Sequence, residues 1–139
     1  MPKIDTTCLI DDDPIFLYGI KKMMRLANFC DRFITYKNGQ DAINALRSIV
    51  KTNKKLPDVI LLDINMPILD GWQFLDEFIH IQLPKKIYVY VVSSSKDVRE
   101  IEKAKAYKQV NNFFIKPISY NDLSHILQEI NQPIDYNLN

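Results

Sequence analysis

The sequence predicts an α/β fold in which helices cover both faces of a five-stranded parallel sheet. Five short β-prone runs alternate with five amphipathic segments along the 139 residues, and turn-forming residues separate them. This regular alternation indicates a parallel sheet, because each connection between parallel strands crosses over a face of the sheet. A chain of this length is sufficient for one domain with its own hydrophobic core.

The first two strand–helix units are marked by their caps. A β-prone run at 6–10 ends in three aspartates, and Pro14 then begins a helix for which Asp13 is the expected N-cap. The second strand is expected at 33–36, and Asn38-Gly39 leads from it into the second helix. Helical spacing predicts that the first helix buries one apolar stripe: Ile15, Phe16, Ile20, Met23, Met24 and Ala27.

The remaining units follow the same order. The third strand, 59–62, is continuously apolar, which is typical of a strand buried on both faces. Asp70-Gly71 begins the third helix, and a fourth strand is expected at 87–92. A charged helix from about 96 to 107 and a strand at 112–115 come next. The last helix is expected to be capped by Ser119 or Asn121.

Composition and charge set the broad class. The chain is 47% hydrophobic and 25% charged, with a formal net charge of +1, which gives no case for nucleic acid or a membrane surface as partner. Cys8 and Cys30 lack metal-binding spacing and are interpreted as free thiols, Cys30 in the connection after the first helix. We expect a cytoplasmic protein with one domain at 1–131 and a polar tail at 132–139.

Polar residues gather where the predicted strands end. They are Asp11 and Asp12 after the first strand, Asp63 after the third, Ser93 after the fourth and Lys116 after the fifth. Each has a structural alternative as a loop acid, a turn serine or a solvated lysine. Because the carboxyl ends of parallel strands form one edge of a sheet, we expect these five side chains to converge. Chance alone is a poor explanation for polar residues at four strand ends.

The combination of these groups indicates a chemistry. Three carboxylates in one pocket repel each other unless a cation is present, and oxygen ligands suit Mg²⁺. A lysine supplies a positive charge and a serine supplies a hydroxyl donor. A carboxylate nucleophile beside a metal, a lysine and a hydroxyl describes a site that forms an aspartyl phosphate.

The sequence resembles the receiver domains of two-component response regulators, of the stand-alone type, over about residues 4–131. The motifs that carry the resemblance are Leu9–Pro14, Leu61–Pro67 with Asp70-Gly71, Val92–Ser94 and Phe114–Pro117. The resemblance implies a flavodoxin-like fold with strand order 2-1-3-4-5. It also implies a phosphoprotein that acts in signal transduction or in a phosphorelay. Its phosphodonor would be a histidine kinase or a histidine phosphotransfer protein. It would not be an enzyme that acts on other substrates.

The resemblance also implies roles for the matched residues. Asp63 matches the phospho-acceptor and a metal ligand, and Lys116 matches the lysine that contacts the phosphoryl oxygens. Asp12 matches the acid that binds Mg²⁺ directly, and Asp11 the acid that binds it through a water. Asn65 matches the residue whose backbone carbonyl completes the metal shell.

The signal is expected to leave through a conformational switch. Ser93 matches the hydroxyl that moves toward the phosphate, Phe113 matches the switch aromatic, and Pro117 is expected to follow a cis peptide bond. Phe113 lacks the hydroxyl of a tyrosine, and Ser94 is bulkier than the alanine common in the family. The expected readout surface comprises helix four, strand five and helix five, on a monomer or weak dimer, and an unknown downstream protein would bind it.

Several alternatives remain open. The chain could be a phosphorelay intermediate, a phosphate sink or a fragment of a longer regulator. An aspartate-nucleophile phosphohydrolase would need an acid two residues after the nucleophile, where this chain has Asn65. A receiver-like domain that binds partners without phosphorylation is disfavoured by the complete set of site residues. Kinase choice is expected to depend on surface residues of the first helix: Phe16, Leu17, Tyr18 and Lys21.

Overall fold

The computed structural model describes residues 4–131 and confirms the predicted fold class. All five strands are parallel and lie in the order β2-β1-β3-β4-β5. The expected tail at 132–139 lies outside the described residues. The strands are β1 (Ile4–Ile10), β2 (Cys30–Tyr36), β3 (Val59–Asp63), β4 (Tyr88–Ser93) and β5 (Val110–Ile115), and the helices are α1 (Pro14–Leu26), α2 (Gly39–Lys51), α3 (Gly71–Phe78), α4 (Val98–Lys105) and α5 (Tyr120–Asn131).

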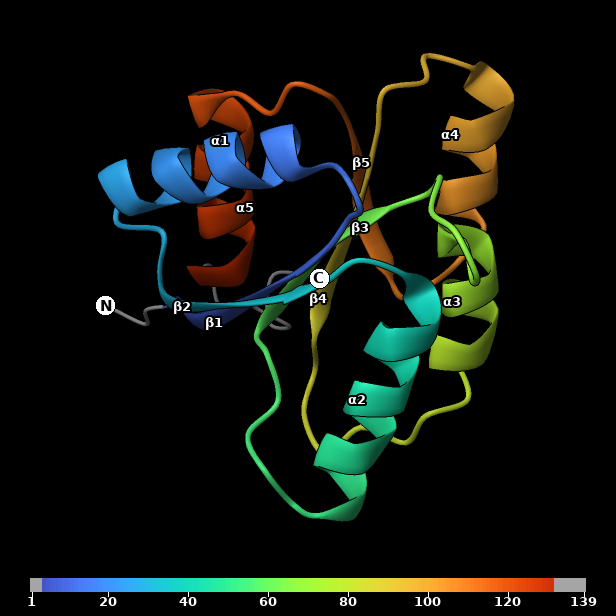
Figure 1. The fold of residues 1–139 in the computed structure, drawn as a ribbon. Coiled ribbons are helices and arrows are strands. Elements are labelled where there is room, and N and C mark those ends of the chain that lie inside the picture. The colour runs from blue at the N-terminus through green and yellow to red at the C-terminus, as the bar shows by residue number, and fades with distance from the viewer. Residues whose placement is uncertain (1–3, 132–139) are drawn as a thin grey trace, which may run out of the picture.

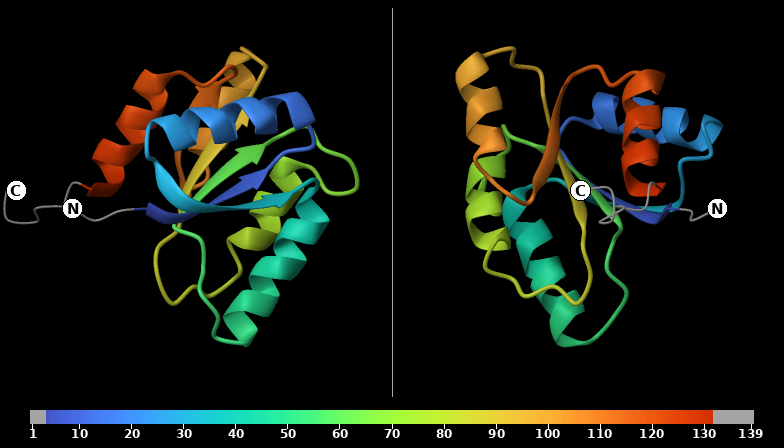
Figure 2. Two further views of the ribbon diagram at one scale, coloured as in Figure 1. Left: turned by 60° about the vertical axis from the view of Figure 1, so that its left-hand side comes forward. Right: turned by 180° about the vertical axis from the view of Figure 1, so that it is seen from behind.

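The helices form a layer on each face of the sheet. α1 and α5 cover one face, and α2, α3 and α4 cover the other (Figures 1 and 2). The central strand β3 contributes to both cores, because successive side chains of a strand point to opposite faces. Ile60 and Leu62 belong to the core under α2 and α3, whereas Val59 and Leu61 belong to the core under α1 and α5.

Most element boundaries follow the local sequence signals. Asp13 caps α1 by accepting hydrogen bonds from the backbone amides of Ile15 and Phe16, and Asn38 caps α2 by accepting from that of Asp41. Ser119 Oγ accepts from the backbone amide of Asp122 in the first turn of α5. No helix within 4–131 combines the length and the apolar character that crossing a membrane requires.

Two expectations about individual positions are wrong. Cys30 is the first residue of β2, not part of a connection, and it pairs in register with Ile4 of β1. The buried stripe of α1 is Leu17, Ile20 and Met24, so Leu17 faces the core and does not belong to an exposed recognition surface. Ile15, expected in the core, is instead 82% exposed.

Two glycines allow the loop after β3 to pack closely against the helices beside it. A Cβ on Gly71 would lie 2.6 Å from the carbonyl oxygen of Asp63, and a Cβ on Gly39 would lie 2.5 Å from that of Leu69. The backbone amides of the same glycines donate to Ile64 O (2.8 Å) and Leu69 O (2.9 Å) respectively. The loop that follows Asp63 is therefore held by backbone contacts on both sides.

We expect Gly71→Ala to lower the free energy of unfolding by about 1–3 kcal/mol, because the methyl group would overlap the backbone that carries Asp63. Gly19→Ala is the matched control, since Gly19 lies in α1 with nothing within 4 Å of an added Cβ. Removing a helical glycine there should raise stability by about 0.5–1 kcal/mol. Urea denaturation measures both, and equal effects would contradict the close approach at Gly71.

Candidate functional site

The carboxyl edge of the sheet brings together residues from four separate strand ends. Asp11 follows β1, Asp63 ends β3, Ser93 ends β4 and Lys116 follows β5. The strand arrows of Figure 2 point toward this common edge. Backbone hydrogen bonds fix its position: the amide of Asp11 donates to Tyr36 O (2.9 Å), and that of Lys116 donates to Ser93 O (2.8 Å).

Three carboxylates form a cluster at this edge. One oxygen each of Asp11, Asp12 and Asp63 lies within 4.8 Å of the others. Asp11 and Asp63 are buried and Asp12 is exposed, so the cluster opens to solvent on one side. Oδ1 of Asp11 accepts from the backbone amide of Asp13 (2.9 Å), whereas its buried Oδ2 accepts no hydrogen bond within the described chain. Three carboxylates that offer hard oxygen donors within this distance fit a small divalent cation.

Lys116 is the cation that faces this cluster in the structure. Its Nζ lies 2.9 Å from Asp11 Oδ2 and 3.7 Å from Asp63 Oδ1, and the Asp11 contact is an ion pair without hydrogen-bond geometry. The ammonium also lies 4.3 Å from the centre of the Phe16 ring. The peptide bond between Lys116 and Pro117 is cis, as expected. One lysine thus faces two buried acids.

Burial and mutual repulsion raise the pKa of the buried acids. The pKa of Asp63 is raised from 3.8 to about 6; desolvation is the largest cause, repulsion by Asp11 acts in the same direction, and Lys116 opposes both. Desolvation also raises the pKa of Asp11, against the opposing effect of Lys116. Asp63 is therefore mostly ionised at pH 7, and its carboxylate is held at an energetic cost that a bound cation would reduce.

The remaining predicted site residues lie near the edge but are not joined to the carboxylates by a hydrogen bond or ion pair. Ser93 is fully buried, and its hydroxyl oxygen accepts from the amide of Ser95 (3.1 Å) and lies 3.5 Å from Glu100 Oε1 in α4. Phe113 is half-buried and packs against the core under α2 and α3. Asn65 is exposed in the loop after β3.

Two contacts of the site were not predicted. Phe16 lies beneath Lys116 Nζ, whereas the sequence predicts it in a core stripe or on a recognition surface. No local pattern distinguishes those two roles from contact with a cation. The contact of Glu100 with Ser93 joins residues seven apart across the loop between β4 and α4. A polar residue in the first turn of a helix is too common to indicate such a contact from sequence.

Comparison with known proteins identifies relatives of this arrangement. The response regulator receiver domain family matches residues 7–128. The probable methanogenesis regulatory protein FilR2 of Methanothrix harundinacea is 27% identical over 89% of this chain and 79% of its own length. A protein-glutamate methylesterase/protein-glutamine glutaminase of Methanococcoides burtonii is 30% identical over 89% of this chain, which spans only 33% of that protein.

Solved structures share the fold. A crystal structure of a two-component response regulator from Cytophaga hutchinsonii has a TM-score of 0.84 and 32% identity, covering 93% of this chain and 98% of that one. The receiver domain of the sensor histidine kinase PA1611 from Pseudomonas aeruginosa PAO1 has a TM-score of 0.74 at 21% identity, over 92% of this chain and 98% of that one. That second structure holds a magnesium ion coordinated in its active-site cleft.

Without metal, Asp63→Asn should raise the free energy of unfolding by about 1–3 kcal/mol at pH 7.5, because it removes a carboxylate whose pKa is raised to about 6 on folding. The folded parent protein takes up a proton at Asp63 as the pH falls through 6. The gain should therefore shrink below pH 6 and vanish near pH 4. Urea denaturation in EDTA at several pH values measures this difference.

Asp58→Asn is the control of opposite sign. Burial raises the pKa of Asp58. Lys85 at 2.6 Å and the backbone amides of Thr6 and Asp5 lower it by a larger amount together, so the net pKa lies below 3.8. This variant should lose stability at pH 7.5, and the loss should disappear as the pH falls through that lowered pKa. The same pH dependence of stability in both variants would contradict the raised pKa of Asp63.

Proposed function

The chain belongs to the response regulator receiver domain family, whose members are phospho-accepting signalling domains, and from this premise we propose that Asp63 is its phospho-acceptor. The observation that carries the proposal is the convergence of Asp11, Asp12 and Asp63 within 4.8 Å, with Lys116 Nζ 3.7 Å from Asp63. The donor is a phosphohistidine of a histidine kinase or a histidine phosphotransfer protein.

In the proposed reaction an Asp63 carboxylate oxygen attacks the phosphorus atom. A P–O bond forms, the P–N bond to the donor imidazole breaks, and the imidazole keeps the electron pair and is protonated. Such a transfer depends on positioning and charge neutralisation more than on acid–base catalysis. The pKa of about 6 leaves Asp63 mostly ionised at pH 7, as a nucleophile requires. Asn65 stands where a phosphohydrolase would carry its acid, which favours signalling over turnover of external substrates.

We infer that the three carboxylates hold Mg²⁺, Asp12 and Asp63 directly and Asp11 through a water, with the backbone carbonyl of Asn65 as a further ligand. The exposed position of Asp12 leaves the cluster open to ligands from solvent. The ion would supply positive charge to the phosphoryl oxygens. The magnesium ion in the PA1611 receiver structure supports this assignment by analogy of fold.

Lys116 and Ser93 are assigned to opposite sides of the incoming phosphoryl group. Lys116 would leave its ion pair with Asp11 to contact a phosphoryl oxygen, because its compact positive charge is attracted to the doubly charged phosphoryl group. Ser93 would exchange its contact with Glu100 for a phosphoryl oxygen, since 3.5 Å marks a weak interaction. Phe113, only half-buried, would then move toward the core.

The phosphodonor is proposed to dock beside α1. An apolar groove of about 270 Å³ lies between α1 and the segment after Lys116, lined in part by Ile15, Phe16, Pro117 and Ile118. Ile15 at its rim is 82% exposed, which no packing role explains. Because Phe16 also contacts Lys116, the groove adjoins the reacting groups.

The readout surface is assigned to α4, β5 and α5. The start of α4 contacts Ser93 through Glu100, whereas its end is attached to α3. Trp72 of α3 stacks on Tyr107 with ring centres 6.2 Å apart, Lys103 lies 4.6 Å from the centre of the Trp72 ring, and Tyr107 donates to Asp76 at 2.6 Å. A shift of Ser93 would therefore act on an α4 that is held weakly at one end and firmly at the other.

We also propose an oligomeric state and a cellular location for the domain. A monomer or weak dimer suits a surface of mixed charge on α4 that meets its downstream protein transiently. Cytoplasmic location is proposed because Cys8 and Cys30 are free thiols, which persist in reducing compartments. A role as phosphorelay intermediate or phosphate sink remains the alternative.

Incubation with acetyl phosphate and Mg²⁺ should add one phosphoryl group to the parent protein, measured by intact-mass spectrometry. Asp63→Asn should remove this gain entirely, because an amide cannot form the acyl phosphate. Asp13→Asn serves as the control: it changes an exposed helix cap next to the site but should leave the stoichiometry intact. Unchanged phosphorylation of Asp63→Asn would overturn the assignment of the acceptor.

Beryllofluoride with Mg²⁺ should change the fluorescence of Trp72, the single tryptophan of the chain, because Trp72 reports on the α3–α4 contact. NMR shifts should change mainly at 93–107 and 113–120. Lys116→Ala should weaken this response even where beryllofluoride still binds. A response confined to residues around Asp63 would favour the relay or sink role over a readout through α4.

A further inference from the structure

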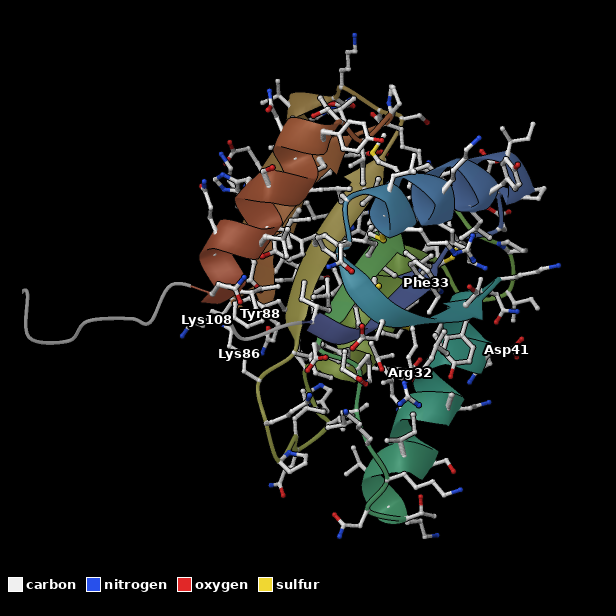
Figure 3. The ribbon with its side chains drawn as sticks, turned by 90° about the vertical axis from the view of Figure 1, so that its left-hand side faces the viewer. Arg32, Phe33, Asp41, Lys86, Tyr88 and Lys108 are labelled. Atoms are coloured by element: carbon white, nitrogen blue, oxygen red, sulfur yellow. The ribbon has the colours of Figure 1, made fainter. Side chains whose placement is uncertain are left out.

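At the opposite edge of the sheet from Asp63, a basic pocket lies where β4 and β5 begin. It encloses about 380 Å³ and is lined by the α3–β4 and α4–β5 connections. Figure 3 shows Lys86 and Lys108 at the same corner of the molecule, near Tyr88. β4 runs from Tyr88 to Ser93, so the pocket is roughly 20 Å from the phosphorylation site.

The three lysines of this pocket differ in how their charge is compensated. Lys85 is neutralised by Asp58 at 2.6 Å. Among residues 4–131, neither Lys86 nor Lys108 has a carboxylate within 4.0 Å, and Lys86 Nζ instead lies 4.6 Å from the centre of the Tyr88 ring. Glu129 is the acid bonded to the pocket residue Asn111, and its two oxygens are taken by Tyr90 OH (2.8 Å) and Asn111 Nδ2 (3.1 Å).

The pocket also has an apolar floor, and Asn111, one of its polar lining residues, is held in place by hydrogen bonds. The floor is formed by Phe78 and Ile87, which are buried, and by Leu83, which is half-buried. Asn111 at the rim cannot rotate freely, because its Oδ1 also accepts from the backbone amide of Val89 (3.1 Å). A pocket of this size that combines an apolar floor with two lysines has the character of a small-molecule site.

We propose that this pocket binds a phosphomonoester with a flat apolar body, of the size of an aryl or nucleoside monophosphate. Two lysine ammoniums match the two negative charges of such a phosphate, and Phe78, Leu83 and Ile87 receive the body. The ligand is a different species from the phosphoryl group on Asp63, and the proposal does not depend on the function of that site.

Phenyl phosphate is the probe, titrated into the ¹⁵N-labelled protein in EDTA so that the acidic cluster stays without metal. We expect saturable NMR shifts at 83–88 and 108–111. Phenol and inorganic phosphate should each bind more weakly, because each supplies only half of the recognised groups. The double variant Lys86→Gln/Lys108→Gln keeps the alkyl stems and should weaken binding about tenfold or more.

The matched control is Lys51→Gln/Lys54→Gln, which removes two lysines from the exposed end of α2 and its following loop. It should leave the affinity for phenyl phosphate unchanged. Thermal unfolding checks that both double variants fold, and phosphorylation by acetyl phosphate should be the same in both. Absence of saturation, an equal loss of affinity in the control, or shifts centred on Asp11 and Asp63 would each overturn the proposal.

Discussion

The site depends on an imbalance of charge: three carboxylates face one lysine at an edge of the sheet that water reaches only from one side. Lys116 lies 2.9 Å from Asp11 and 3.7 Å from Asp63, and it cannot neutralise both. The acids stay together because backbone hydrogen bonds, not charge pairing, hold the segments that carry them. Those bonds are Asp11 N to Tyr36 O, Gly71 N to Ile64 O and Lys116 N to Ser93 O. The fold therefore maintains an electrostatically unfavourable arrangement that a cation and a phosphoryl group would make favourable.

The same edge is linked to α4 through contacts of unequal strength. The Lys116 amide holds the Ser93 carbonyl at 2.8 Å, but the Ser93 hydroxyl meets Glu100 only at 3.5 Å. At the far end of α4, Lys103 lies over the Trp72 ring, and Tyr107, just after the helix, stacks on Trp72 and donates a 2.6 Å hydrogen bond to Asp76 of α3. A rearrangement that begins at Ser93 therefore meets its smallest resistance at the start of α4 and its largest at the end.

The sequence predicted what depends on pattern and order. A continuously apolar run identified β3, Asp13 and Pro14 marked the start of α1, and parallel topology brought four strand ends together. It failed where the pattern is ambiguous. The start of β2 could not be predicted, because Asp31 and Arg32 lack the apolar pattern of a strand. An edge strand exposes such polar side chains. Helical spacing assigned Ile15 to the core, although only tertiary packing decides the phase of the stripe. The orientation of the Ser93 hydroxyl likewise depends on side-chain contacts with α4 that no spacing reveals.

The net charge of +1 conceals an uneven distribution of charge between the two ends of β4. The direction of the strands causes this separation. Asp11, Asp12 and Asp63 follow or end strands, whereas Lys86 and Lys108 precede them. Compensation at each end is incomplete: Lys116 is shared between Asp11 and Asp63 at one end, and Asp58 pairs with Lys85 at the other. β4 is buried along most of its length and separates the two ends. A bound cation would compensate the excess of negative charge around Asp63, and a bound anion would compensate the lysines that precede β4 and β5.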